Sequence, residues 1–306
     1  MIGDRWTYWR LVVRAVMVPV SAFLGCTLMF FALHVLAGDP VAREAHQTPQ
    51  QYAQEMRARG LDLPLPVQYV RLLGRILHGD LAVRLQPEAL LTAKEGLLAV
   101  LIAVPLGLGI GLIAASRANS LTDRLLVGAS LMVYSIPNFL WALLLVVIGV
   151  SVLYNLTGGL IFYNPGPCCQ GAQILMPAFA LGAPFVGYIA RHTRAGLLDV
   201  MRREYIATAR AKGLAEAAVV RRHALRNTLI SVVTIVGPIV TAMLTGSLVV
   251  EQAFGVPGLG RELIFAILGR NYDVAVGVFV YYVVLIGIAN FAVDLLYPLL
   301  DPRIAV

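Results

Sequence analysis

Long runs without a charged residue are the feature that most restricts how this chain can fold. The runs that lack Asp, Glu, Lys and Arg occupy 15–38, 96–116, 125–190, 227–250 and 274–293. A helix needs about 20 apolar residues to cross the hydrocarbon of a bilayer. The run 125–190 has 66 residues, too many for one crossing, and suits two crossings separated by the turn-favouring segment 154–172. The sequence therefore predicts an all-α polytopic membrane protein with six transmembrane helices.

The predicted spans can be given boundaries, and together they predict a membrane domain of about 96–298 preceded by one further helix. These spans are 15–38, 96–116, 125–153, 173–190, 227–250 and 274–298. The first run is too long for the apolar core of a signal peptide and lacks a small-residue cleavage site, so we expect it to be retained. Prolines inside the runs are expected to kink the helices without ending them.

Composition and charge placement agree with a lipid-embedded chain. Hydrophobic residues make up 59% of the sequence and charged residues 13%, and the net charge is +7. The segments 1–14, 117–124, 191–226 and 299–306 hold 15 Lys or Arg in 66 residues, whereas 39–95, 154–172 and 251–273 hold 9 in 99. Because basic residues stay on the cytoplasmic side, both termini are predicted to be cytoplasmic. The placement of the basic residues is explained by the orientation of the chain in the membrane, so no nucleic-acid partner is expected.

The segment 191–226 carries most of the charged residues in the second half of the chain and has no place in a bilayer. It carries nine basic and three acidic residues, and inserting them would cost about 30 kcal/mol. Its alanines favour a helix that Gly213 would end, and Ala207 and Ala211 would share one small-residue face. The segment is either a basic topological anchor without a partner or a helix that docks on another protein. Its length and small-residue face favour docking.

Several blocks of sequence, spread over nearly the whole chain, resemble one family. They are YIATARAKGLAEAAVVRRHALRN at 205–227, GDP at 38–40, GLDLPLPVQYVRLL at 60–73, HGDL at 78–81, YSIPNFLWALLL at 134–145, GSLVVEQAFGVPGLGRELIFAILGRNYDVAVG at 246–277 and VDLLYPLLDPRI at 293–304. The chain is similar to permeases of ATP-binding-cassette (ABC) importers of the dipeptide, oligopeptide and nickel branch. The resemblance implies the type I importer permease fold, in the bacterial inner membrane.

The same resemblance implies partners and a coupling helix. The implied partners are a second homologous permease, two ATPase subunits that bind ATP and Mg²⁺, and an extracytoplasmic solute-binding protein. No cofactor is expected in this chain itself. The cargo stays open between dipeptides, oligopeptides, nickel and a metal chelate. The residues implied to couple to the ATPase are Glu204, Ala207, Thr208, Ala209, Arg210, Ala211, Lys212, Gly213 and Leu214.

The first outer loop, 39–95, is too long for a simple connection. Thr48, Pro49 and Gln51 predict a capped helix that Gly60 ends. A second helix is predicted from one apolar face, formed by Tyr69, Leu72, Leu73, Ile76 and Leu77. These helices either rest on the bilayer or bundle, or receive a binding protein. A loop of this size resembles the first permease of the family's unlike pair, although 82–96 is shorter than the family pattern.

The second outer loop, 251–273, contains a ten-residue apolar stretch that is too short to span. Leu263, Ile264, Ile267 and Leu268 predict one face of a surface or re-entrant helix. Gly255 and Gly260 have the spacing of a phosphate loop, but Arg261 and Glu262 follow them where a Lys and a Ser or Thr would be required. A nucleotide site is therefore not expected here.

No catalytic or metal-binding motif is present, so the chain is expected to transport rather than catalyse. Cys26, Cys168 and Cys169 form no disulfide framework or metal cluster. Polar side chains within the spans are candidates for a translocation path, or else for hydrogen bonds between helices. They are Tyr134, Ser135, Asn138, Thr241, Thr245, Ser247, Tyr281, Tyr282 and Asn290. A carrier driven by an ion gradient is the alternative, but it would need charged groups at mid-membrane, which the runs lack.

Overall fold

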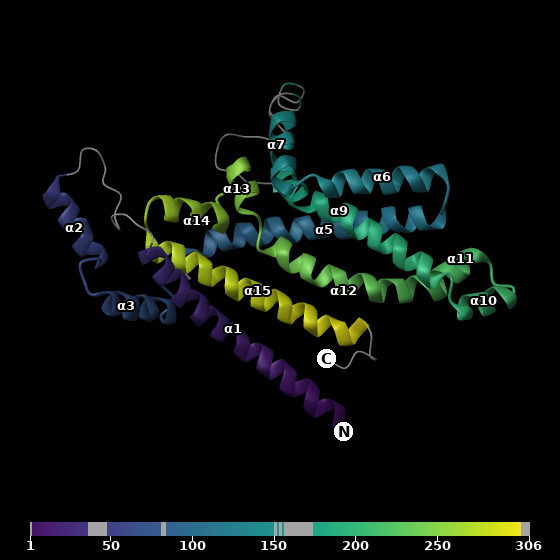
Figure 1. The fold of residues 1–306 in the computed structure, drawn as a ribbon, viewed down its shortest axis with the longest axis horizontal. Helices are drawn as coiled ribbons and strands as arrows, with labels where there is room; N and C mark the ends of the chain where they lie inside the picture. The colour runs from purple at the N-terminus through teal and green to yellow at the C-terminus, as the bar shows by residue number, and fades with distance from the viewer. Residues whose placement is uncertain are drawn as a thin grey trace.

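The computed structural model describes residues 2–35, 48–80, 84–149, 152, 155 and 174–300, and these residues contain helices and turns but no strand. The helices are α1 (Ile2–Val35), α2 (Pro49–Arg59), α3 (Leu65–Leu77), α5 (Gln86–Ser116), α6 (Leu121–Ser135), α7 (Asn138–Ile148), α9 (Leu175–Val200), α10 (Glu204–Ala211), α11 (Glu216–Val219), the π-helical turn η3 (Val220–Ala224), α12 (Leu225–Leu244), α13 (Leu248–Phe254), α14 (Leu259–Leu268) and α15 (Tyr272–Leu300). Figure 1 shows an elongated bundle with α10 and α11 at one end and α2, α3 and α14 at the other.

Helix α9 is the centre of the bundle and packs against α5, α6, α7 and α12. Glycines let the backbones approach closely. A Cβ atom at Gly111 would lie 2.5 Å from the carbonyl oxygen of Ala190, and one at Gly187 would lie 2.2 Å from that of Ser130. Lipid tails are as apolar as the helices, so such close van der Waals packing is what holds membrane helices together.

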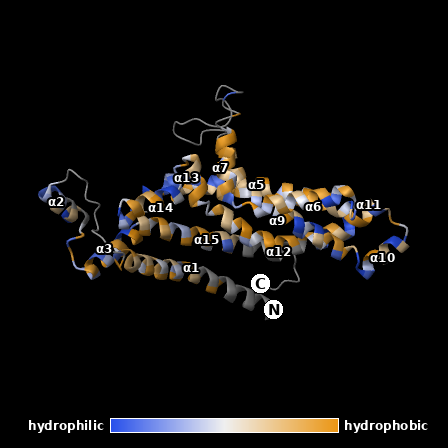
Figure 2. Cartoon of the chain, turned by 45° about the horizontal axis from the view of Figure 1, so that its top comes forward, coloured by the Kyte–Doolittle hydropathy of each residue, from blue (hydrophilic) through white to orange (hydrophobic). Residues whose placement is uncertain are grey.

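Helices α1 and α15 form a flank beside this centre (Figure 1). Cys26, Phe30 and Leu33 of α1 are buried in one cluster with Val274 and Val278 of α15. The opposite face of α1 leaves large apolar side chains uncovered. Figure 2 shows that apolar residues follow the bundle along its length, whereas polar ones gather at the α10–α11 end and in α2. This distribution is what a bilayer around the middle of the bundle requires.

Three helical segments are long and apolar enough to cross a membrane, namely Val16–Val35, Gln86–Ser116 and Tyr272–Ala292. Two bent pairs raise the number to five if each is one span, and these are Leu121–Ser135 with Asn138–Ile148 and Glu216–Leu229 with Val232–Leu244. Residues 175–190 of the remaining predicted span lie in α9, which packs against α5, α6, α7 and α12. Several apolar helices are thus present, while six crossings stay a prediction.

The predicted boundaries differ from the helices in three places. The predicted span 125–153 is not one helix, because α6 and α7 meet at 96°; Pro137 cannot donate an N–H and holds Ile136 extended. Helix α5 begins at Gln86, ten residues before the predicted span 96–116. The predicted span 227–250 is divided at Gly246, which has a φ of +68° and lies between α12 and α13. The turn predicted at 154–172, with Cys168 and Cys169, lies outside the described residues except for Asn155.

The outer helices follow most of the sequence pattern. Thr48 and Gln51 form the predicted capping box, and Gly60 ends α2 with a φ of +67°. On α3, Leu72 is buried and Tyr69, Leu73 and Ile76 pack around it, as predicted. Leu77 is exposed instead, because α3 ends there. On α14 the buried residues are Leu259, Gly260 and Ala266 rather than the predicted face, of which Ile267 and Leu268 are exposed.

Candidate coupling site

Helix α10 rests on the ends of the central helices. Its Ile206 and Ala209 are buried in one cluster with Ala115 of α5, Leu197 of α9 and Val219 of α11. A helix of eight residues has little stability of its own, so this cluster is what fixes α10 to the bundle. A push on α10 would therefore reach α5 and α9 directly.

Gly213 makes the turn that separates α10 from α11. Its φ is +79°, a left-handed conformation that a side chain disfavours. The Gly213 N–H donates to the carbonyl of Arg210 at 2.9 Å, and the Leu214 N–H donates to that of Ala209 at 3.4 Å. These two bonds form a Schellman motif, the helix ending that a glycine at this place predicts.

A salt bridge closes the turn. Arg210 donates from Nη2 and Nε to the two carboxylate oxygens of Glu216, at 2.6 and 3.0 Å. This two-point hydrogen bond from the Arg210 guanidinium lowers the pKa of Glu216. Asn227 of α12 donates to the Tyr205 hydroxyl at 2.7 Å, which ties α10 to the start of the next long helix. Together these contacts hold α10, α11 and α12 as one unit.

The outward face of α10 and its turn carries nearly all of the residues expected to couple. Ala209 differs, since it is buried and anchors the helix. The exposed members are Glu204, Ala207, Thr208, Arg210, Ala211, Lys212, Gly213 and Leu214. Small side chains at Ala207 and Ala211 leave room for a close approach, and the cations of Arg210 and Lys212 stand beside them. Arg210 is already paired with Glu216, so the small-residue face and the Lys212 cation are what this surface offers to a groove on a partner protein.

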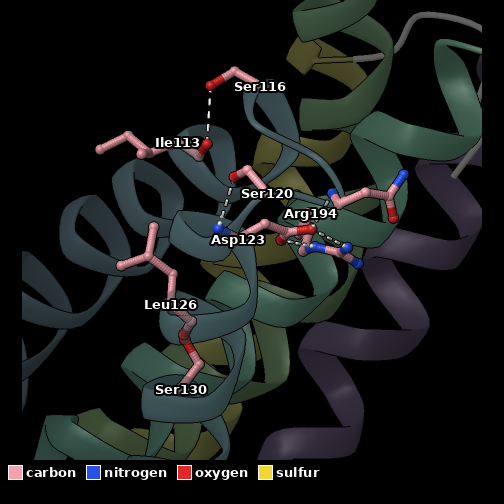
Figure 3. A network of polar contacts seen from close by, with 8 residues as sticks. Ile113, Ser116, Ser120, Asp123, Leu126, Ser130 and Arg194 are labelled. Atoms are coloured by element: carbon pink, nitrogen blue, oxygen red, sulfur yellow. Dashed lines mark hydrogen bonds and ion pairs between the residues drawn. The ribbon is translucent and has the colours of Figure 1, made fainter.

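Asp123 and Arg194 form a connection between helices at the same end of the bundle, which the sequence did not indicate. Arg194 of α9 donates from Nε and Nη2 to the two carboxylate oxygens of Asp123 in α6, at 2.6 and 2.7 Å (Figure 3). The N–H of Asn119 donates to the same carboxylate, and Ser120 caps α6 through the Asp123 N–H. The pairing fixes the α5–α6 turn to α9, about ten residues before α10 begins.

Glu251 forms a second unpredicted polar contact, near the other end of the bundle. Its buried carboxylate accepts a hydrogen bond from the Thr92 hydroxyl at 2.7 Å and one from the backbone N–H of Arg261 at 3.0 Å. Thr92 in turn accepts from the N–H of Leu259. Helix α14 begins after Gly258, which has no capping side chain, so Glu251 and Thr92 satisfy its first N–H groups. The contact joins α5, α13 and α14.

Four of the residues predicted for a translocation path form two hydrogen-bonded pairs. Asn138 donates to Ser247 at 3.4 Å, where α6 breaks into α7. Thr241 of α12 donates to Asn290 of α15 at 2.9 Å. Of the remaining members, Tyr134 and Ser135 are exposed on α6, Thr245 lies at the end of α12, and Tyr281 and Tyr282 lie on α15. The two pairs are hydrogen bonds of the kind that join membrane helices, and a role of these residues in a path stays a prediction.

Two further observations limit the chemistry of the described residues. They contain no group of three or more His, Cys, Asp or Glu residues that could hold a metal ion. Gly255 and Gly260, which have the phosphate-loop spacing, have separate structural roles. Gly255 ends α13 with a φ of +67°, and Gly260 packs on Glu251, since a Cβ atom there would lie 2.9 Å from its carboxylate.

Comparison with known proteins relates this architecture to one family. Residues 107–306 match the family described as binding-protein-dependent transport system inner membrane component. The chain is 34% identical to the dipeptide transport system permease protein DppB of Escherichia coli K12, over 96% of this chain and 98% of that protein. It is 36% identical to the di/tripeptide transport system permease protein DppB of Pseudomonas aeruginosa, over 93% of this chain and 95% of that protein.

A solved structure shares the fold. The MetNI methionine ABC transporter in an inward-facing conformation matches with a TM-score of 0.57 and 20% identity, covering 71% of this chain and 96% of that one. The long helices, their polar interruption and the family match agree with one another. The chain belongs to the binding-protein-dependent transport system inner membrane components, the membrane-embedded permeases of ABC importers.

Proposed function

We propose that this permease lines the path by which short peptides cross the inner membrane, together with a second homologous permease. Relatives from two bacteria carry names that specify dipeptide or di/tripeptide transport, which supports peptides as the cargo. Two ATPase subunits that bind ATP and Mg²⁺ would supply the energy, and a solute-binding protein would deliver the peptide.

The observation that carries this proposal is the exposed α10–Gly213–α11 unit. It presents small residues and cations outward, while Ile206 and Ala209 bury its other side against α5 and α9. ATP binding would draw the ATPase subunits together and displace α10. Because α9 and α12 continue directly from this unit, its displacement would tilt both helices and open the path to the opposite side.

The ends of the bundle support one orientation. The start of α1 and the end of α15 lie toward the α10–α11 end, whereas α2, α3 and α14 lie at the opposite end (Figure 1). With the ATPases in the cytoplasm, both termini are cytoplasmic and the outer helices face the binding protein. The basic residues of 191–226 support the same orientation.

The test uses the complete transporter in proteoliposomes, with the binding protein and a radiolabelled dipeptide. We expect uptake that requires ATP inside and persists when an uncoupler removes the proton gradient. The variant Ala207→Trp with Lys212→Glu changes the docking face and leaves the Arg210–Glu216 salt bridge in place. It should lose co-purification with the ATPases while the two permeases stay together. Uptake that follows the proton gradient without ATP would reject the proposal. Uptake of nickel or a metal chelate in place of the dipeptide would reject only the proposal that peptides are the cargo.

A further inference from the structure

A hollow lined by arginines lies at the end of the bundle opposite α10. Two adjoining cavities of about 210 and 270 Å³ open between the α2–α3 turn, helix α3 and the junction of α14 with α15. Both cavities are lined by Ala58, Leu61, Arg75, Tyr272 and Asp273. The function proposed above uses none of these side chains.

The lining of this hollow is strongly cationic. Arg71, Arg75, Arg84 and Arg270 line one or both cavities, and Asp273 is the one carboxylate among the described lining residues. Arg75 forms a salt bridge with Asp273, so this carboxylate is already paired, and the described lining residues carry four guanidinium groups and one carboxylate. Guanidinium groups match phosphate in shape and charge better than any other side chain does. The chemistry therefore selects a phosphate-type anion.

The backbone at Arg270 adds an independent observation. Its φ is +53°, a left-handed conformation in which glycine is the ordinary residue. The N–H of Arg270 donates to the carbonyl of Ile267, and that of Asn271 to Ala266, so this is the end of α14. A glycine would make this turn without strain, yet an arginine occupies it and lines the cavity. The turn itself therefore does not require an arginine at this position, and the side chain of Arg270 extends to the cavity.

The surroundings indicate where the anion comes from. Helix α3 supplies Arg71 and Arg75 to the hollow, while its Val70 and Leu77 are 66% and 85% exposed. On the neighbouring α1, Leu28 and Val35 are 72% and 84% exposed. A helix with buried, cationic and exposed aliphatic residues is suited to the boundary between headgroups and acyl chains. Tyr272 beside the cavities fits the same level of the membrane.

We propose that this hollow binds the phosphate of an anionic phospholipid, whose acyl chains lie along the exposed aliphatic residues of α1 and α3. The arginines hold the phosphate, and the uncovered Val70 and Leu77 contact the lipid tails. The bound lipid would fasten α3 to the flank of the bundle. An acidic segment of a binding protein would satisfy the cations but would leave these aliphatic side chains in water.

The test measures lipids retained by the complete transporter, by native mass spectrometry after extraction from nanodiscs of phosphatidylcholine with or without phosphatidylglycerol. Wild type should retain phosphatidylglycerol. Arg270→Gly removes one guanidinium and suits the left-handed backbone at this position. Together with Arg71→Gln, it should lower phosphatidylglycerol retention about tenfold, which is the scale of one or two charge-assisted hydrogen bonds. Arg57→Gln is the matched control, because this exposed arginine of α2 lines neither cavity.

Three results would overturn the proposal. The first is unchanged phosphatidylglycerol retention in the Arg270→Gly and Arg71→Gln variant when its melting temperature equals that of wild type. The second is displacement of the lipid by millimolar inorganic phosphate alone, which would make the hollow a site for free anions. The third is a loss of affinity for the binding protein without any change in lipid retention. Failure of peptide uptake with normal lipid retention would bear on the proposed function instead.

Discussion

Arg194 donates two hydrogen bonds to Asp123, and this pair is far less exposed than the other ion pair of α9. Asp123 is 3% exposed and Arg194 26%, whereas Asp199 and Arg203 are 64% and 62% exposed. The bond lengths are similar, 2.6 and 2.8 Å. Water weakens an exposed pair, and a partly buried charge that loses its partner is destabilising. The two pairs should therefore contribute very differently to stability.

We predict that Asp123→Asn lowers the free energy of unfolding by about 2 kcal/mol, because Arg194 loses its ionic partner. The matched change Asp199→Asn should cost less than about 0.5 kcal/mol. Thermal unfolding of the purified transporter in detergent measures both. A double-mutant cycle with Arg194→Gln separates the pair from the effect of each residue alone. Equal effects of Asp123→Asn and Asp199→Asn would contradict the structural role assigned to the buried pair.

The turn at Gly213 gives a second prediction, which separates backbone conformation from bulk. A Cβ atom at Gly213 meets nothing within 4 Å, while the φ of +79° disfavours a side chain. Asparagine tolerates this conformation and β-branched valine does not. Gly213→Asn should keep most ATPase co-purification and dipeptide uptake, whereas Gly213→Val should lose at least about tenfold of both, since a misplaced α10 cannot dock. An equal loss of co-purification and uptake in both variants would show that the size of the new side chain at the docking surface, rather than the backbone conformation, causes the effect.

Local signals in the sequence were enough for several elements. The spacing of Thr48 and Gln51 predicted a capping box, and the two side chains form it. Gly213 was predicted to end the helix of 204–211, and its left-handed φ does so. Each of these features depends on contacts within four or five residues, so a short window of sequence contains all the information needed.

Features that depend on distant contacts were missed. Lys94 and Glu95 fall at the end of the predicted outer loop 39–95, yet both lie within α5, where Glu95 is buried and Lys94 exposed. No local signal marks the buried contact of Glu251, because its partners, Thr92 and Arg261, are separated from it by 159 and 10 residues. Pro137 was expected to kink one helix, but nothing local distinguishes a kink from the 96° break between α6 and α7.

The packing around Glu251 gives a third prediction. A Cβ atom at Gly258 would lie 2.5 Å from the Glu251 carboxyl carbon, closer than any side-chain contact allows. Gly258→Ala should therefore destabilise the transporter by about 1–3 kcal/mol, the usual cost of overpacking. Gly74→Ala is the control, since Gly74 lies inside α3 with nothing within 4 Å of its Cβ position and should gain about 0.5–1 kcal/mol. Thermal unfolding compares the two, and a neutral Gly258→Ala would refute the tight packing of Glu251.

The salt bridge across Gly213 gives the last prediction, a dependence on pH. The Arg210 guanidinium holds the pKa of Glu216 below its ordinary value of 4.5. A carboxyl whose pKa is lower in the folded state contributes stability above its unfolded pKa and loses that contribution as pH falls through the folded pKa. The turn between α10 and α11 should therefore be tightest at neutral pH and loosen below about pH 4.5. The contribution is modest because both side chains are about half exposed.

Hydrogen exchange at the Gly213 and Leu214 amides, corrected for the intrinsic rate at each pH, measures this loosening. Both amides donate within the turn, to the carbonyls of Arg210 and Ala209. In wild type their protection should fall as the pH drops below about 4.5. Glu216→Gln should lower the protection of both amides at neutral pH and remove its pH dependence. Glu204→Gln changes an exposed carboxylate outside this pair and should leave both the protection and its pH dependence unchanged. Loss of protection with the same pH profile in Glu216→Gln would show that another group controls the turn.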